Sequence, residues 1–79
     1  MKKVQILGTG CLKCSQLEAN ARTAVEQTGA ACEVVKVSDL NEIMSFGVMM
    51  TPALAVDGEV KSVGKVLPAE EIAKILRNL

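Results

Sequence analysis

The sequence predicts an α/β fold whose strands and helices follow one another in the order β-α-β-α-β-β-α. Three features lead to this prediction: two short apolar runs, a long segment of helical apolar spacing between them, and a hairpin signal ahead of a last helix. Two strands joined by a helix are expected to be parallel, with a right-handed crossover, whereas a hairpin adds antiparallel strands. We therefore expect a four-stranded mixed sheet with helices on both faces, formed by residues 1–79 as a single domain.

The first strand and the first helix are predicted from a change in apolar spacing. Residues 4–7 form a β-like run that ends at the Gly-Thr-Gly of residues 8–10. From about Leu12 to Thr28, apolar positions recur every three or four residues, which is typical of one helix face. They are Cys14, Leu17, Ala21, Ala24, Val25 and Thr28. Gly29 is well placed to end this helix in a left-handed cap.

The middle of the chain predicts a second strand and a short helix. The second strand is the valine-rich segment Cys32–Val37. Asp39, followed three residues later by Glu42, indicates the start of a helix, and Gly47 indicates its end. The expected inner face of this helix is formed by Leu40, Ile43 and Met44.

A hairpin and a closing helix are predicted for the last part of the chain. Ala53–Val56 and Glu59–Val63 flank Asp57-Gly58, a pair that accepts the positive φ angles of a type I′ turn. Pro68 suits the first turn of the closing helix. The expected buried stripe of that helix is Ile72, Ile75, Leu76 and Leu79.

Composition and charge exclude several classes of function. Hydrophobic residues make up 49% of the chain and charged residues 23%, a balance that allows a packed core. Nine basic and nine acidic residues give a formal net charge of zero, with no basic stripe for nucleic acid or an anionic membrane. The sequence contains no run of about 18 apolar residues, which is the length that would indicate a membrane span. We expect a cytoplasmic monomer, in a compartment where structural disulfides are uncommon.

The reactive side chains narrow the chemistry further. The chain has no histidine, which excludes a Cys–His nucleophile pair and any metal site that uses histidine. Its three cysteines are too few for a four-thiolate zinc site within one chain. We therefore look for chemistry that the cysteines perform themselves, and we expect no bound metal or cofactor.

Cys11 and Cys14 form the motif with the most chemical meaning, because two residues separate them where a predicted strand passes into a helix. The first helical turn presents unpaired N–H groups and a partial positive charge, which lower the pKa of a thiol. Cysteines three positions apart at a helix start also share a face, close enough for a disulfide. We expect Cys11 to be exposed and to attack, and Cys14 to be shielded and to resolve the mixed disulfide.

Two other interpretations of this pair stay open. Two thiolates at this spacing also suit Cu(I) or another soft metal, and residues 8–14 resemble the loop of small heavy-metal-associated domains. Those domains run β-α-β-β-α-β, however, whereas this chain has a helix start at Asp39 and a closing helix. The plainest interpretation makes both thiols ordinary buried small residues. The topology and the expected cytoplasmic setting favour redox chemistry.

These motifs resemble those of the thioredoxin and glutaredoxin superfamily, and more narrowly those of the small redox-active disulfide protein 2 group. The resemblance covers nearly the whole chain: residues 8–11 with Cys14, then Thr51-Pro52 before the hairpin, then the closing helix. It implies a thioredoxin-like fold in which Cys11 attacks, Cys14 resolves, and Pro52 follows a cis peptide bond and faces the pair. It also implies that the backbone of Thr51 binds an extended substrate.

The function predicted on this basis is that of a small thiol–disulfide oxidoreductase. It would reduce or exchange disulfides in partner proteins and be reduced by a thioredoxin-reductase-like or other thiol donor. A soft-metal carrier and a non-catalytic binding module are the alternatives. Cys32 is expected to be a buried small apolar residue without a redox role. Met44, Met49 and Met50 are expected either to fill gaps in the core or to line a substrate groove.

Overall fold

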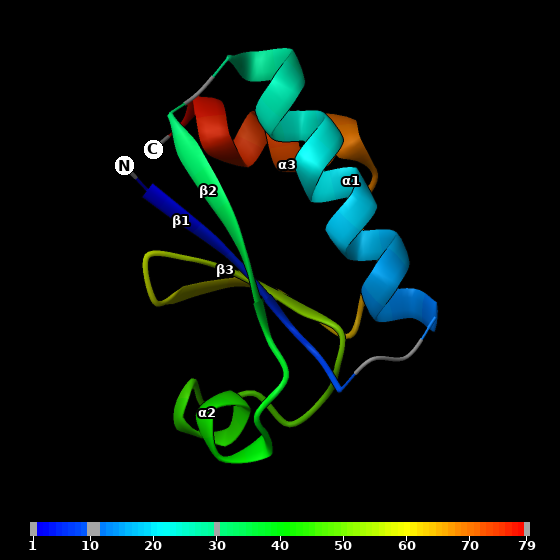
Figure 1. The fold of residues 1–79 in the computed structure, drawn as a ribbon, viewed down its shortest axis with the longest axis vertical. Helices are drawn as coiled ribbons and strands as arrows, with labels where there is room; N and C mark the ends of the chain where they lie inside the picture. Colours follow the sequence, from blue (N-terminus) through cyan, green and yellow to red (C-terminus); the bar gives the residue numbers. More distant parts are fainter. Residues whose placement is uncertain (1, 10–11, 30, 79) are drawn as a thin grey trace.

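A computed structural model of the chain describes residues 2–9, 12–29 and 31–78. Its elements are β1 (Lys2–Leu7), α1 (Leu12–Thr28), β2 (Cys32–Val37), α2 (Leu40–Ser45), β3 (Ala53–Val56), β4 (Glu59–Val63) and α3 (Ala69–Arg77). The strands form one sheet in the order β2-β1-β3-β4, in which β1 is parallel to β2 and antiparallel to β3, and β3 is antiparallel to β4. The predicted element order and the four-stranded mixed sheet are both confirmed (Figure 1).

The alternation of side chains along each strand divides the core between the two faces of the sheet. Val4 and Ile6 of β1 are buried in one cluster with side chains of α1 and α3. Leu7 belongs to a smaller cluster that includes Ile43 of α2. The predicted helices on both faces are therefore confirmed: α1 and α3 contact each other on one face, and α2 lies apart from them (Figure 1).

α1 presents the apolar face that its sequence predicts. Its buried side chains are Cys14, Leu17, Ala21 and Ala24. Val25 and Thr28, at the end of that stripe, are half-buried. Gly29 has a φ of 63° and donates its N–H to the carbonyl of Val25 at 3.1 Å, so the expected left-handed end of the helix is confirmed.

The hairpin turn has the geometry that its two central residues predict. Asp57 has a φ of 50° and Gly58 a φ of 86°, both positive as a type I′ turn requires. The turn is also held against β1. The N–H of Lys3 donates to Oδ1 of Asp57 at 2.8 Å, and the N–H of Gly58 donates to Oε1 of Gln5 at 2.8 Å.

β4 carries an irregularity in its pairing with β3. Leu54 lies opposite Ser62, whereas Ala55 lies opposite Val60, so Lys61 is an extra residue on the β4 side. An extra residue of this kind bends a strand and increases its twist. Because β4 is an outer strand of the sheet, the irregularity falls at one edge of the molecule's β-structure.

α2 begins as predicted but buries less than expected. The Asp39 carboxylate accepts two N–H groups of the first turn, at 2.8 and 3.3 Å, and so caps the helix. The predicted inner face is wrong for two of its three members: Leu40 is 62% exposed and Met44 is 64% exposed, while Ile43 is buried. The reason is that α2 has six residues and covers only one end of the sheet, where a small cluster takes up a single side chain from it.

α3 differs from the prediction at its start and in its buried stripe. Pro68, expected in the first turn, is the N-cap residue with extended backbone (φ −68°, ψ 159°). The buried side chains are Ile72, Ala73 and Leu76, with Ile75 half-buried. The predicted stripe omits Ala73, whose small side chain faces the contact with α1; Leu79 lies outside the described residues. Within the described part of the chain, no helix is long and apolar enough to cross a membrane.

Candidate redox site

Cys14 lies in the first turn of α1 and is shielded from solvent. The residue is 1% exposed, and it shares its helix face with the buried Leu17. The shielding expected for this cysteine is therefore confirmed, whereas its role as the resolving thiol stays a prediction. Cys11, the expected attacking thiol, lies outside the described residues, which resume at Leu12, the first residue of α1.

Gly8 forms the wall against which Cys14 is packed. It follows the last residue of β1, and its N–H donates to the carbonyl of Val37 at 3.0 Å, which extends the pairing of β1 with β2 by one residue. A Cβ placed on Gly8 would overlap Sγ of Cys14 and would come within 3.0 Å of Cβ of Cys14. The end of the strand and the start of the helix therefore meet at this glycine. The sequence pattern indicates only the end of a strand at Gly8 and does not reveal this contact.

The Thr51–Pro52 segment immediately precedes β3. The peptide bond between the two residues is cis, so the prediction drawn from the resemblance is confirmed. Pro52 is buried, and its carbonyl accepts the N–H of Gly64 at 2.8 Å, which fixes the segment to the end of β4. Thr51 is exposed. Its contact with substrate stays a prediction, but the residue is open to solvent.

A hollow of about 340 Å³ brings together segments that are far apart in the sequence. It is lined by Thr9, Leu40, Ile43, Met44, Val48, Met49 and Thr51, and we call it the apolar hollow. Thr9 stands two residues before Cys11, and Thr51 stands directly before Pro52. The fold thus brings Thr9, which is close to the cysteine pair in the sequence, and Thr51, which precedes Pro52, onto one shared surface. No sequence pattern indicated that Thr9 and Leu40 belong to this surface.

The methionines of the apolar hollow are exposed to solvent. Met49 is 97% exposed and Met44 is 64% exposed, so the interpretation that they fill gaps in the core is wrong. The other interpretation, that they line a groove, agrees with their position in the hollow. Met50, 63% exposed, lies against Gly64 and is not part of the lining. Flexible thioether side chains of this kind adapt to differently shaped partners.

Cys32 lies at the far end of the sheet from Cys14. It pairs with Lys2, at the start of β1, whereas Cys14 packs on Gly8, just beyond the end of β1. Six residues of strand span about 20 Å, while a disulfide needs Cα atoms within about 7 Å of each other. Cys32 packs against the cluster under α1 and α3 but is only half-buried, so the full burial expected for it is not found. This separation supports the prediction that Cys32 has no redox role.

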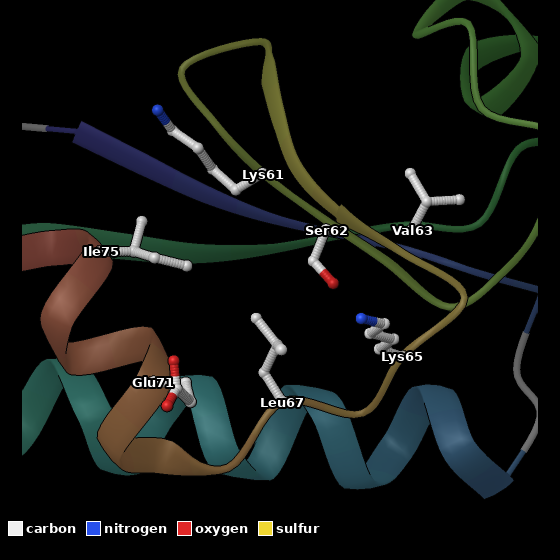
Figure 2. Close-up of a pocket in the computed structure, with 7 residues that line it drawn as sticks. All are labelled: Lys61, Ser62, Val63, Lys65, Leu67, Glu71 and Ile75. Atoms are coloured by element: carbon white, nitrogen blue, oxygen red, sulfur yellow. The ribbon is translucent and has the colours of Figure 1, made fainter.

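A second hollow, of about 400 Å³, lies between β4 and α3 (Figure 2). The side chains of Ser62, Lys65 and Glu71 are among those that line it. Oγ of Ser62 is buried, has no hydrogen-bond partner in the described part of the chain, and points toward the segment between β4 and α3 in Figure 2. None of the described residues predicted for the redox site lines this hollow.

The parallel β1–α1–β2 unit, the antiparallel hairpin, and a cysteine and a cis-proline at the starts of α1 and β3 define a thioredoxin-like α/β protein. The family model described as a thioredoxin domain matches residues 2–77. The chain therefore belongs to the thioredoxin domain family, which makes it a thioredoxin-type redox protein.

Two similar proteins are both named thioredoxin. The protein of Methanothermobacter thermautotrophicus is 49% identical over 76 residues, which cover 96% of this chain and 99% of that protein. The protein of Methanocaldococcus jannaschii is 42% identical over 78 residues, which cover 99% of this chain and 90% of that protein. The similarity in both cases extends over nearly the whole of both chains.

Proposed function

We propose that this chain is a small thiol–disulfide oxidoreductase that uses Cys11 and Cys14 as a dithiol–disulfide pair to reduce or exchange disulfides in partner proteins. The observation that carries the proposal is the shielded thiol of Cys14 in the first turn of α1, three positions after a second cysteine, in a chain of the thioredoxin family. We further propose that it acts as a single-domain monomer in the cytoplasm, without a bound cofactor.

The first step is an attack by the Cys11 thiolate on one sulfur of a partner disulfide. A new S–S bond forms between Cys11 and that sulfur, and the second partner sulfur leaves as a thiolate. Cys11 directly precedes α1, whose first N–H groups and partial positive charge favour a thiolate over a thiol. The partner is now held as a mixed disulfide.

The second step releases the partner. Cys14 gives up its proton, its thiolate attacks the Cys11 sulfur, and the Cys11–Cys14 disulfide forms as the remaining partner sulfur leaves. Two electrons have passed from this chain to the partner, whose two thiolates take up protons. An external dithiol donor, such as a thioredoxin-reductase-like protein, then reverses the change on this chain by the same kind of exchange.

The partner would bind across Thr51 and the apolar hollow. Thr51 is exposed directly before a buried proline, so its backbone is available to pair with an extended segment of the partner. The hollow beside it, with Met44 and Met49 in its wall, offers an adaptable apolar surface to a side chain near the partner's cystine. This surface suits protein disulfides of varied sequence. Neither nucleic acid nor a membrane is a proposed partner.

The test is to trap the mixed disulfide. In a Cys32→Ala background, the Cys14→Ser variant is expected to accumulate a covalent complex with a protein disulfide, because the second step is lost. The Cys11→Ser variant is expected to form none and to lose turnover. Non-reducing electrophoresis and mass spectrometry identify the complex and the cysteine that forms it. Equal trapping by the two variants would refute the assignment of the attacking and resolving roles.

A further inference from the structure

Position 8 requires glycine because there is no room for a side chain next to Cys14, and not because of its backbone conformation. Four glycines of the described chain, Gly29, Gly47, Gly58 and Gly64, have a positive φ. Gly8 does not, so its backbone is one that other residues adopt. Its lack of a side chain matters because a Cβ there would overlap Sγ of Cys14.

Cys14 has little freedom to avoid a side chain at position 8. Its Sγ moves by rotation about one bond, and one of the three staggered positions is disfavoured in a helix because it meets the preceding turn. Its Cβ, 3.0 Å from the place that a methyl group on Gly8 would occupy, does not move with that rotation. Gly8 is itself held by its hydrogen bond to Val37 at 3.0 Å. A methyl group at Gly8 would therefore drive the thiol of Cys14 out of its shielded position.

We propose that Gly8 is a positioning residue for the redox reaction: its bare Cα sets the depth and direction of the Cys14 thiol. The proposal rests on the proposed function for its catalytic meaning, since it is the resolving step that needs this thiol in place. Its steric part does not depend on redox activity and is tested separately.

The steric part is tested with a protein that keeps Cys14 as its only thiol, through Cys11→Ser and Cys32→Ala. In this protein, the modification of Cys14 by a thiol reagent is expected to be slow, because the side chain is 1% exposed. Adding Gly8→Ala is expected to raise the modification rate by at least about tenfold under native conditions. The reason is that the Cys14 thiol can no longer occupy its shielded position unless the new methyl group moves away. An unchanged rate would overturn the proposal.

The matched control is Ala73→Gly, which destabilises a buried position of α3 without altering the wall of Cys14. It is expected to leave the modification rate close to that of the parent protein. If it raises the rate as much as Gly8→Ala does, general loosening explains the effect and the proposal fails.

A double-substitution experiment locates the overlap and covers the case in which Gly8→Ala does not fold. Gly8→Ala is expected to lower the thermal midpoint less when Cys14→Ala is also present, because the overlapping sulfur has been removed. Folding of the double variant where Gly8→Ala alone fails would support the proposal. An equal loss of stability in both backgrounds, or failure of both variants to fold, would place the conflict elsewhere and overturn it.

The catalytic part is tested in the full chain with all three cysteines. Gly8→Ala is expected to prolong the mixed disulfide with a protein substrate, because Cys14 is displaced while Cys11 is chemically intact. Suppose that thiol exposure rises but the lifetime of the mixed disulfide does not change. Gly8 would then position Cys14 only sterically, and the catalytic part of this proposal would be overturned, whereas the resolving role of Cys14 is decided by the trapping experiment with Cys14→Ser.

Discussion

Replacing Met44 by glutamine should weaken the binding of protein disulfides without weakening the chemistry. Met44 is 64% exposed on α2 and lines the apolar hollow. Complete burial of a methionine side chain is worth about 1.5–3 kcal/mol, so covering the part that is still exposed is worth about 1–2 kcal/mol. At about 1.4 kcal/mol for each factor of ten, KM for a protein disulfide should rise about 5- to 30-fold. Glutamine keeps the length and the helix propensity of methionine, so α2 should be preserved.

The assay compares two substrates of different size. KM and kcat are measured for a protein disulfide and for a small aromatic disulfide, which carries no polypeptide segment that could cover the hollow. Met50→Gln is the matched control, because Met50 is 63% exposed in the connection between α2 and β3 but does not line the hollow. The expected result is a raised KM for Met44→Gln with the protein disulfide alone, and no comparable change for Met50→Gln.

Two results would refute this reasoning. If Met44→Gln and Met50→Gln change KM equally, general surface hydrophobicity and not the apolar hollow determines binding. If Met44→Gln lowers kcat for the small disulfide as well, the side chain influences the thiols and not the partner. A circular dichroism spectrum unchanged from that of the parent protein makes either conclusion safe.

Three further predictions concern the helix cap, the third cysteine and metal. Asp39→Ala should cost about 1 kcal/mol of unfolding free energy in denaturant titrations, because two capped N–H groups lose their acceptor, while Asp39→Asn should cost less. Cys32→Ala should retain disulfide reductase activity; a disulfide that includes Cys32 after mild oxidation would contradict this. Elemental analysis of protein purified under reducing conditions should find no stoichiometric copper or zinc, whereas a one-to-one content would favour the soft-metal carrier.

The fold was predictable because its elements are specified by local patterns. The spacing of apolar residues along α1 and the Asp57-Gly58 pair in the hairpin each determine one local conformation, and both predictions are confirmed. The cap at Asp39 is equally local, since its acceptor and its donors lie within three residues. Patterns of this range need no knowledge of what packs against the element.

The unpredicted features of α2, of Gly8 and of the α3 stripe depend on contacts between distant segments. Leu40 and Met44 have helical apolar spacing with Ile43, but the small area of sheet beneath α2 accepts only Ile43. In the sequence, Gly8 indicates only the end of a strand, whereas its contact with Cys14 arises because the fold brings the start of α1 against it. Alanine is only weakly hydrophobic, so the sequence pattern did not predict that Ala73 is buried by the contact of α3 with α1. For the candidate site, sequence therefore supplied the reactive residues, and the tertiary structure supplied their surroundings.

The irregular pairing of β4 affects how readily a strand of another chain could add to this edge of the sheet. An outer strand exposes unpaired N–H and C=O groups, which invite another chain to extend the sheet. The extra residue in β4, Lys61, interrupts that row, and its ammonium group pairs with Glu59 at 3.0 Å on the same strand. Bends and charges on an outer strand both discourage the addition of a foreign strand. A chain proposed to offer the backbone of Thr51 to many partners would thereby keep a second, unwanted place of strand addition closed.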